Sequence, residues 1–169
     1  ITVGNANQNI QVSATGGSAG SAAGNGGTIN INAGNNLTVN SAFSTAGPLG
    51  INGDGANITY RAGVAASPAQ GRLVVTSAIN ASSVGTGDGG SVTLESNSNQ
   101  TFLVGGSTVN SINGAITADG ATGGQISISN RRSGGVTRAS AASHSANATA
   151  GHGGVIVLTP SGNRELIFH

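Results

Sequence analysis

The sequence contains five copies of a corner motif with glycine, each followed by a run that alternates apolar and polar residues. They read GNGGTININA, GDGANITYRA, GDGGSVTLES, ATGGQISISN and GHGGVIVLTP, and begin near residues 24, 53, 87, 121 and 151. Their third positions fall at residues 26, 55, 89, 123 and 153, so that successive copies are 29, 34, 34 and 30 residues apart. A repeat of this length is typical of a solenoid, a propeller or another repeat array.

All five copies keep one side-chain parity after the corner. Three and five residues beyond the third position stand only apolar or aromatic residues: Ile29, Ile58, Val92, Ile126 and Ile156, then Ile31, Tyr60, Leu94, Ile128 and Leu158. Of the residues between them, four are polar and one is apolar: Asn30, Thr59, Thr93, Ser127 and Val157. A period of two predicts a β-strand with one buried face.

Further apolar residues follow each of these runs. Four copies carry a second apolar pair: Leu37 and Val39, Leu73 and Val75, Phe102 and Val104, and Leu166 and Phe168. The fourth copy has Val136, but Arg138 replaces the second inward residue, which predicts either a very short strand or a local bulge. Three copies have a third apolar residue six positions after the first of the pair: Phe43, Ile79 and Ala142. The pattern therefore predicts about three short strands per repeat.

One repeat alone has nothing against which to bury these side chains. Stacked repeats place each inward residue about 4.8 Å from its equivalents above and below. We therefore predict an all-β fold, a right-handed parallel β-helix (solenoid) of about five coils, in which residues 1–169 form a single domain. A propeller would need about four strands in each blade of 40 or more residues. The right hand follows the usual preference of parallel crossovers.

Composition narrows the function classes. The net charge of the 169-residue chain is +1, which indicates no electrostatic attraction to nucleic acid or anionic lipid. Arg131 and Arg132 are the only basic pair, and we interpret them as part of a solvated loop. Cysteine is absent, which excludes disulfides and thiolate metal sites. No run of apolar residues is long enough to predict a membrane span.

The stretches GNGGTININAGNNLTVNSAFSTAG and AINASSVGTGDGGSVTLES resemble the haemagglutinin-type repeats of bacterial filamentous haemagglutinins and related secreted adhesins, particularly the Gly-Asn-rich cyanobacterial exoproteins. The pattern G-[ND]-G-G-x-[IV]-x-[IVL] recurs across nearly the whole chain. The resemblance implies an elongated right-handed β-helix that is secreted to the cell surface and has an adhesive or scaffolding role. It supplies no catalytic residues. The predicted partners are the chain itself, end to end or within a longer chain, and host or cell-surface glycans.

The corner motif itself could be read as a metal or phosphate site. Its second position varies among Asn25, Asp54, Asp88, Thr122 and His152, which is not the ligand set of a calcium array. A phosphate cradle needs a helix after the glycines, and the residues that follow are strand-like. We therefore interpret the motif as a tight turn, in which Gly adopts positive φ and Asn or Asp tolerates the left-handed region.

The candidate catalytic groups are scattered. The acidic residues are Asp54, Asp88, Glu95, Asp119 and Glu165. Asp54 and Asp88 share one repeat position and should stack one coil apart, and Asp119 lies in the loop before the next corner. Cleavage of a saccharide would also need aromatic platforms, yet the only Tyr, Tyr60, falls at an inward position. His144, His152 and His169 lie in predicted loops or at the terminus. We predict no catalytic, cofactor-binding or metal site and no enzymatic activity.

These observations favour a structural or adhesive segment of a secreted or cell-surface fibrous β-helical protein. The main alternative is a filament subunit that stacks end to end through open β-helix ends, because ITVGN and NRELIFH both resemble a second strand and neither end shows a capping helix. The pattern is also compatible with a polysaccharide-active β-helix enzyme and with an ice-binding solenoid, the latter suggested by the column of Thr59, Thr93 and Ser127. Five Asn-x-Ser/Thr triplets, at Asn36, Asn57, Asn80, Asn99 and Asn147, are expected by chance in such a chain.

Overall fold

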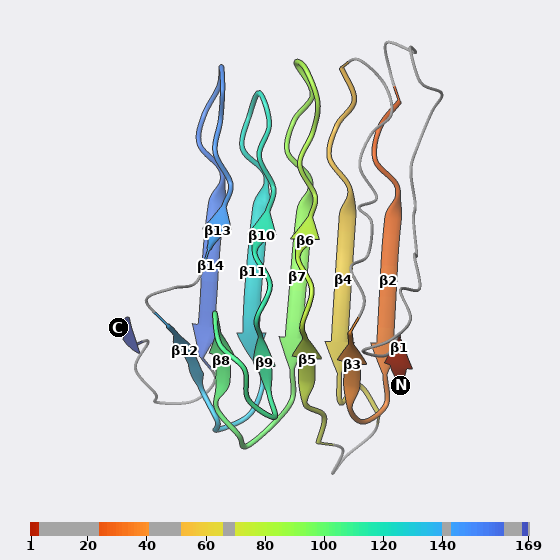
Figure 1. Cartoon of the computed structure of the whole chain (residues 1–169), viewed down its shortest axis with the longest axis vertical. Helices are drawn as coiled ribbons and strands as arrows, with labels where there is room; N and C mark the ends of the chain where they lie inside the picture. The colour runs from red at the N-terminus through yellow and green to blue at the C-terminus, as the bar shows by residue number, and fades with distance from the viewer. Residues whose placement is uncertain (4–23, 41–51, 66–69, 140–142, 161–166, 169) are drawn as a thin grey trace.

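The protein is a β-solenoid of about three complete turns, built from three parallel sheets (Figure 1). The computed structural model describes residues 1–3, 24–40, 52–65, 70–139, 143–160 and 167–168. Within these ranges every regular element is a strand, and all pairings between named strands are parallel. The prediction of an all-β parallel solenoid is confirmed.

The five-stranded sheet contains the strand that follows each corner motif. Its members are β2 (Thr28–Ala33), β4 (Asn57–Ala62), β7 (Ser91–Ser96), β11 (Gln125–Asn130) and β14 (Val155–Pro160), paired in that order. The register pairs Ile58 with Ile29 on one side and with Val92 on the other, and Ile126 lies between Val92 and Ile156. The columns of inward residues predicted from the repeat are therefore confirmed.

The seven-stranded sheet holds the second strand of each repeat. Its order is β1 (Thr2–Val3), β3 (Leu37–Val39), β5 (Leu73–Val75), β9 (Ser111–Ile112), β8 (Phe102–Val104), β12 (Val136–Arg138) and β15 (Ile167–Phe168). Strand β12 has the same three-residue length as β8, and Arg138 pairs in register with Val104. Of the two alternatives predicted at Arg138, the bulge was wrong, because the backbone ladder continues although the side chain is charged. The strand is very short, but it is no shorter than β3, β5 and β8.

Strand β9 is an insertion that the sequence pattern did not reveal. It lies between β5 and β8, so the third repeat contributes two strands to this sheet and one to the five-stranded sheet. Asn110, which precedes β9 and is fully buried, joins the insertion to its surroundings. Its Oδ1 accepts hydrogen bonds from Leu73 N (3.0 Å) and Ser96 Oγ (2.8 Å), and its Nδ2 donates to Gln100 O (3.1 Å).

The three-stranded sheet completes each turn with β6 (Ile79–Asn80), β10 (Ile116–Thr117) and β13 (His144–Ser145). Ile79 is buried in β6, as predicted. Its equivalents in the register are Ile116 and His144. The predicted residues Phe43 and Ala142 lie outside the described residues. In the third repeat Ile116 follows the insertion of β9, and in the fourth repeat the column falls at His144, eight residues after Val136 rather than six. A fixed spacing from the second strand therefore does not locate this position.

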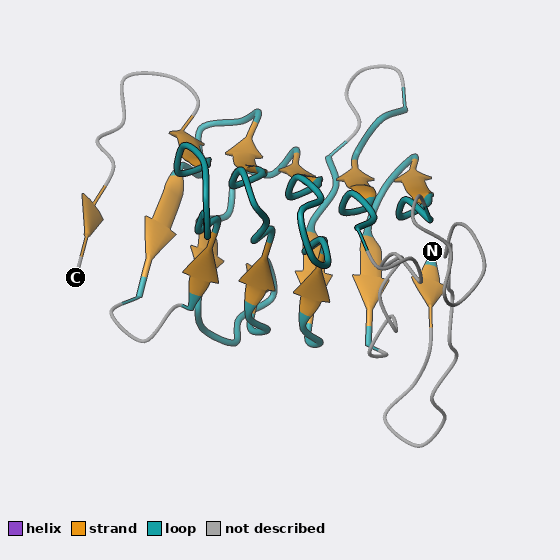
Figure 2. Cartoon of the chain, turned by 90° about the horizontal axis from the view of Figure 1, so that it is seen from above, coloured by secondary structure: helices purple, strands orange, loops and turns teal. Residues whose placement is uncertain are grey.

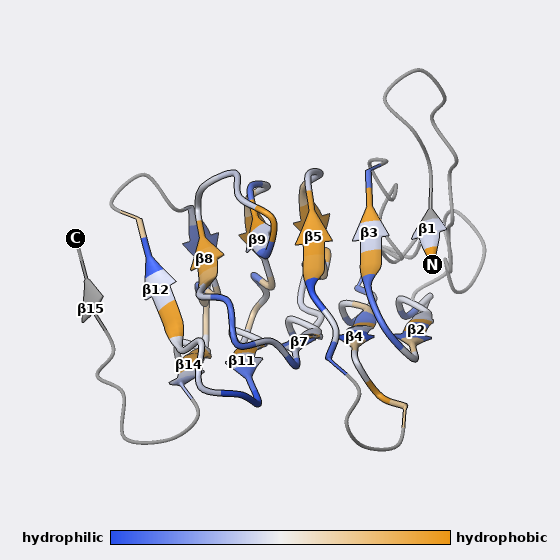
Figure 3. Ribbon diagram, turned by 90° about the horizontal axis from the view of Figure 1, so that it is seen from below, coloured by the Kyte–Doolittle hydropathy of each residue, from blue (hydrophilic) through white to orange (hydrophobic). Residues whose placement is uncertain are grey.

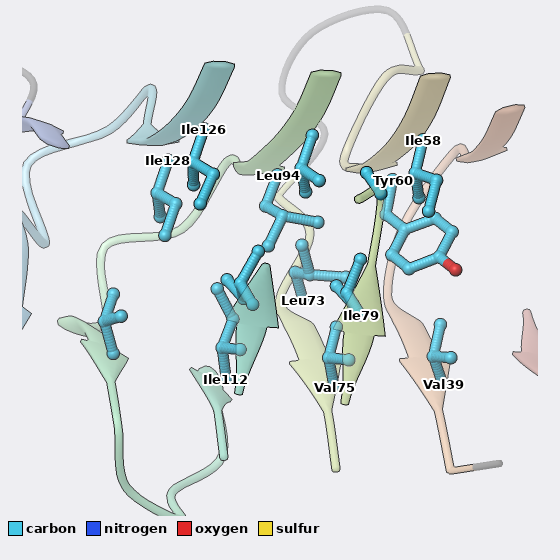
Figure 4. Close-up of a cluster of buried hydrophobic side chains, with 14 of the residues drawn as sticks. Val39, Ile58, Tyr60, Leu73, Val75, Ile79, Leu94, Ile112, Ile126 and Ile128 are labelled. Carbon is cyan, nitrogen blue, oxygen red and sulfur yellow. The ribbon is translucent and has the colours of Figure 1, made fainter. Parts of the chain in front are cut away.

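The core is a narrow apolar column enclosed by the three sheets. In Figure 4, inward side chains from the five-stranded sheet, such as Ile58, Leu94 and Ile126, point toward those of the opposite sheet, such as Val75 and Ile112. All five are at most 2% exposed. Figure 2 shows the repeats following one another along the stack, and Figure 3 shows the apolar colouring of β5, β8 and β9.

Candidate functional site: the glycine corners and the outer face

The corner motif is a hydrogen-bonded junction between successive repeats. We number its positions from its first residue. The N–H of position 3 donates to the carbonyl of position 2 in the next repeat at all four junctions: Gly26 to Asp54 (2.7 Å), Gly55 to Asp88 (2.8 Å), Gly89 to Thr122 (2.8 Å) and Gly123 to His152 (3.0 Å). At position 4 the N–H donates a 2.8 Å hydrogen bond to the carbonyl of the residue that follows a strand of the three-stranded sheet. The pairs are Gly90 with Ala81, Gly124 with Ala118 and Gly154 with Ala146. The motif therefore closes each turn and starts the next one.

The glycines are required by close backbone approach rather than by positive φ. Positive φ among the described residues occurs only at Gly63, Gly85, Gly105 and Gly135. A Cβ on Gly55 would lie 2.0 Å from Ala81 O and 2.3 Å from Gly90 N, and the equivalent atom on Gly123 would lie 2.2 Å from both Ala146 O and Gly154 N. The prediction of a corner is confirmed, but the predicted conformational reason for its glycines was wrong.

The side chain at position 2 bonds to the next repeat in the first part of the stack. Asn25 Oδ1 accepts a hydrogen bond from Asp54 N (3.0 Å), and Asp54 Oδ1 accepts one from Asp88 N (2.9 Å). Asp54 and Asp88 are thus neighbours in successive repeats, as predicted. An amide oxygen and a carboxylate oxygen accept the same hydrogen bond here, which explains why both Asn and Asp occur at this position in the first three repeats.

An open groove of about 480 Å³ runs across the corners of the last four repeats. Glycine backbone lines most of it, together with Asp54 and Asp88. Asp119 does not line this groove. Its Oδ1 accepts hydrogen bonds from Asn147 N (2.6 Å) and Ser145 Oγ, so it joins two repeats elsewhere on the stack. The structure therefore does not bring Asp119 together with the other two aspartates at this groove.

A charged cluster lies at the C-terminal ends of β4, β7 and β11, whereas the corners precede the N-terminal ends of these strands. Glu95 Oε1 is 3.2 Å from Arg131 Nη1, and its Oε2 is 3.9 Å from Arg61 Nε. With Asn32 and Val64 these residues line an open groove of about 490 Å³. The sequence interpretation missed this cluster, although a signal was present: Arg61 and Glu95 share position 9 in adjacent repeats, and the register pairs them.

Tyr60 and the histidines occupy unrelated places. Tyr60 is fully buried beside Ile58 in the core (Figure 4), and this burial raises the pKa of its phenol above the ordinary range. His144 belongs to β13, whereas His152 is exposed at a corner. His169 lies outside the described residues. In the described part of the chain, no group of three or more His, Asp or Glu side chains could hold a metal ion.

The outer face of the five-stranded sheet presents the predicted polar column. Thr59, Thr93 and Ser127 are in register and partly exposed, and exposed Asn30 and Val157 occupy the two ends of the column. The face is a row of short polar side chains that changes to valine at β14.

Asparagine side chains join repeats on several sides of the solenoid. Four residues of the Asn-x-Ser/Thr triplets accept hydrogen bonds through Oδ1 from the next repeat. The pairs are Asn36 with Arg72 N (3.0 Å), Asn57 with Ser91 Oγ (2.8 Å), Asn80 with Thr117 Oγ1 (2.9 Å) and Asn99 with Ser133 Oγ (3.2 Å). The fifth, Asn147, donates through Nδ2 to Ser145 Oγ (2.8 Å). Asparagine is therefore a structural residue here, a role that the sequence interpretation did not assign to it.

Comparison with known proteins gives no match, whether to protein-family models, curated proteins or solved structures. Among the described residues, no helix is long and apolar enough to cross a membrane.

Proposed function

We propose that the chain is a structural and adhesive segment of a secreted or cell-surface fibrous β-helical protein, and that it performs no catalysis. In this proposal the five repeats form five coils of a right-handed solenoid, and the chain is related to the haemagglutinin-type adhesins that its repeats resemble. The parallel stack and the recurrence of one residue class at each position support the architectural part of the proposal.

The use of the carboxylates is the observation that carries the proposal. Three of the four acidic residues in the described ranges bond to another repeat: Asp54 to Asp88 N, Asp119 to Asn147 N, and Glu95 to the two arginines. Asp54 and Asp88 both line the corner groove, but Asp54 accepts a hydrogen bond from Asp88 N, and Glu95 and Asp119 lie elsewhere and contact other repeats. These carboxylates therefore join repeats rather than form the free pair that saccharide hydrolysis needs. Such an arrangement suits a rod that presents a long surface.

Adhesion is assigned to the outer face of the five-stranded sheet. This face carries short hydroxyl and amide side chains, and the cluster of Arg61, Glu95 and Arg131 lies at the C-terminal ends of its inner strands. Arginine binds carboxylate and sulfate oxygens through paired N–H donors, so acidic sugars are the expected ligands. The side chains of Arg61 and Arg131 are 43% and 61% exposed, although the Nε atom of Arg61 is itself buried.

A panel of immobilised neutral, carboxylated and sulfated oligosaccharides tests this assignment. We expect binding to acidic sugars that is lost in an Arg61→Ala, Arg131→Ala double variant. An Arg72→Ala variant is the matched control, because Arg72 precedes β5 in the seven-stranded sheet. Cleavage of any oligosaccharide, or binding that persists unchanged in the double variant, would contradict the proposal.

The second candidate is a filament subunit that stacks end to end. The exposed apolar residues of β14, at the last strand of the five-stranded sheet, favour it. Analytical ultracentrifugation over a range of concentrations, with electron microscopy, tests it: fibres that grow with concentration support stacking, whereas a strict monomer opposes it.

A further inference from the structure

Nothing in the described part of the chain gives Gly153 a steric cause. It occupies position 3 of the last corner, where the Cβ sites of Gly55, Gly89 and Gly123 lie only 2.2–2.5 Å from the position 4 nitrogen of the next repeat: Gly90 N at 2.3 Å, Gly124 N at 2.5 Å and Gly154 N at 2.2 Å. A Cβ on Gly153 would meet nothing within 4 Å, and its φ is not positive. The residue is thus the one that a further coil, stacked on β14, would require.

Strand β14, at the edge of the five-stranded sheet, also exposes apolar side chains. Val155, Ile156 and Val157 are 54%, 43% and 38% exposed, although β14 is apolar on both faces. Val155 N donates to Gly124 O (3.0 Å), and successive residues of a parallel strand direct their peptide groups to opposite sides. The peptide groups of Ile156 and Leu158 therefore point away from β11, toward the open edge.

We propose that a second copy of this chain stacks on β14 through its β2, in parallel and in the register of the repeat. This inference rests on the second candidate function and names its interface. Strand β2 is the other outermost strand of the five-stranded sheet and, among the described strands, pairs with β4 alone. Asn57 N donates to Gly27 O (3.0 Å), so the peptide groups of Thr28 and Asn30 point away from β4.

The proposed register continues the inward columns of the solenoid. Ile156 faces Ile29 of the copy, and Leu158 faces Ile31, as Ile126 and Ile128 face Val92 and Leu94 inside the chain. Gly27 of the copy occupies position 4, and its nitrogen takes the place beside Gly153 that Gly154 N takes beside Gly123. A head-to-tail contact of this kind does not close on itself and therefore produces an open filament.

The seven-stranded sheet can accommodate the junction. Strands β15 and β1 are its outermost members, so both would lie between β12 and β3 of the copy. This places one strand more in that sheet than in the five-stranded sheet. The chain already contains the same surplus, because β8 and β9 both lie where the five-stranded sheet has β7 alone.

Gly153→Val separates assembly from folding. The added side chain meets open space in the monomer and the backbone of the copy in the stack. We expect sedimentation of Gly153→Val to show loss of the assembled species, with a melting temperature unchanged from that of the native chain. Gly123→Val is the matched control at the same corner position and should lower the melting temperature, since its side chain would collide with Gly154 N and Ala146 O.

A cross-linking experiment tests the register independently of Gly153. The chain has no cysteine, so a double variant with Val157→Cys and Asn30→Cys carries only the two introduced thiols. These outward positions belong to opposite ends of the stack and meet only between copies, at a strand spacing that suits a disulfide. Oxidation should give a ladder of head-to-tail oligomers on a non-reducing gel, whereas pairing Val157→Cys with Asn32→Cys, two residues out of register, should not.

The outcomes separate the interface from the function on which it rests. Fibres that persist in Gly153→Val, together with no cross-linking in the proposed register, would overturn this interface and leave the filament function standing on another contact. A native chain that stays monomeric at every concentration would overturn the filament function and this interface together. If Gly153→Val alters the melting temperature, the register-specific cross-link decides: its presence supports the interface and its absence overturns it.

Discussion

Truncating one isoleucine column at two places tests the packing argument. Ile126 is fully buried between Val92 and Ile156, whereas Ile156, which occupies the same position of the last repeat, is 43% exposed. Ile→Ala removes three carbons, a transfer term of roughly 2.4 kcal/mol at about 0.8 kcal/mol for each carbon. With the cavity that remains, Ile126→Ala should cost about 2–5 kcal/mol. Ile156→Ala loses a little over half of the transfer term, about 1.4 kcal/mol, and leaves no enclosed cavity.

Thermal unfolding followed by circular dichroism measures the difference. For a chain of this length, about 2–4 °C of melting temperature corresponds to 1 kcal/mol, so Ile126→Ala should melt roughly 5–15 °C below the native chain. The shift for Ile156→Ala should be smaller, about 3–6 °C, measured at a concentration where both are monomeric. Equal shifts for the two variants would refute the assignment of Ile126 to a closed core and of β14 to an open edge.

Three further predictions concern the glycine corner, the buried phenol of Tyr60 and the hydrogen bond between Asp54 and Asp88 N of the next repeat. Gly55→Asn should destabilise the fold as strongly as Gly55→Ala, because any Cβ collides with backbone there, whereas Gly85, with φ of 59°, should tolerate Asn better than Ala in urea titrations. Because the pKa of Tyr60 is raised in the folded state, its contribution to the free energy of unfolding is fully present below about pH 10, the ordinary phenol pKa. Above that pH the free energy of unfolding should fall by up to about 1.4 kcal/mol per pH unit, and Tyr60→Phe should remove this contribution to alkaline destabilisation, as measured by urea unfolding at several pH values. Asp54→Ala should cost about 0.5–1.5 kcal/mol by losing the bond to Asp88 N, and Asp54→Asn should retain most of the stability, as measured by urea unfolding.

The parts of the fold that the sequence predicts are those in which one position repeats one physical environment. The inward residues Ile58, Val92 and Ile126 each meet an apolar neighbour above and below, so the period of two and the repeat length together determined their register. The second strands were predicted for the same reason, because Leu73 and Val75 meet Leu37 and Val39 in the ladder.

Strand β9 could not be predicted in this way because it occurs once. Among the described strands, Ser111 and Ile112 have no equivalents in the other repeats. The strand is held by Asn110, whose buried side-chain amide forms hydrogen bonds to Leu73, Ser96 and Gln100. A column pattern contains no information about a single insertion of this kind. The charged cluster was missed for a related reason, since Arg61 and Glu95 differ in residue type although they share a position and meet across the sheet.

The positions of the glycine corners were predicted correctly, but the reason why they need glycine was not. A turn with positive φ and a close backbone approach both select glycine, and the sequence pattern does not distinguish them. The structure does, because the Cβ of Gly55 would overlap Ala81 O while its φ stays negative or extended. The distinction matters for function, since a φ requirement is satisfied within one repeat whereas a steric requirement depends on the repeat that follows.

That dependence on the next repeat sets the character of the open end. The last corner has glycine at position 3 (Gly153), as a following coil would require. Position 10 of the last repeat is Pro160, whereas the two preceding repeats have Ser96 and Asn130 there. Arg131 N donates to Ser96 O (2.8 Å), so position 10 faces the next repeat, and proline removes the N–H from the edge at that point. The edge is therefore complete near the corner and lacks a donor at its far end. Stacking through it should be weaker than any interior junction and reversible with concentration, and Pro160→Ser should strengthen assembly at a given concentration without changing the register of cross-linking.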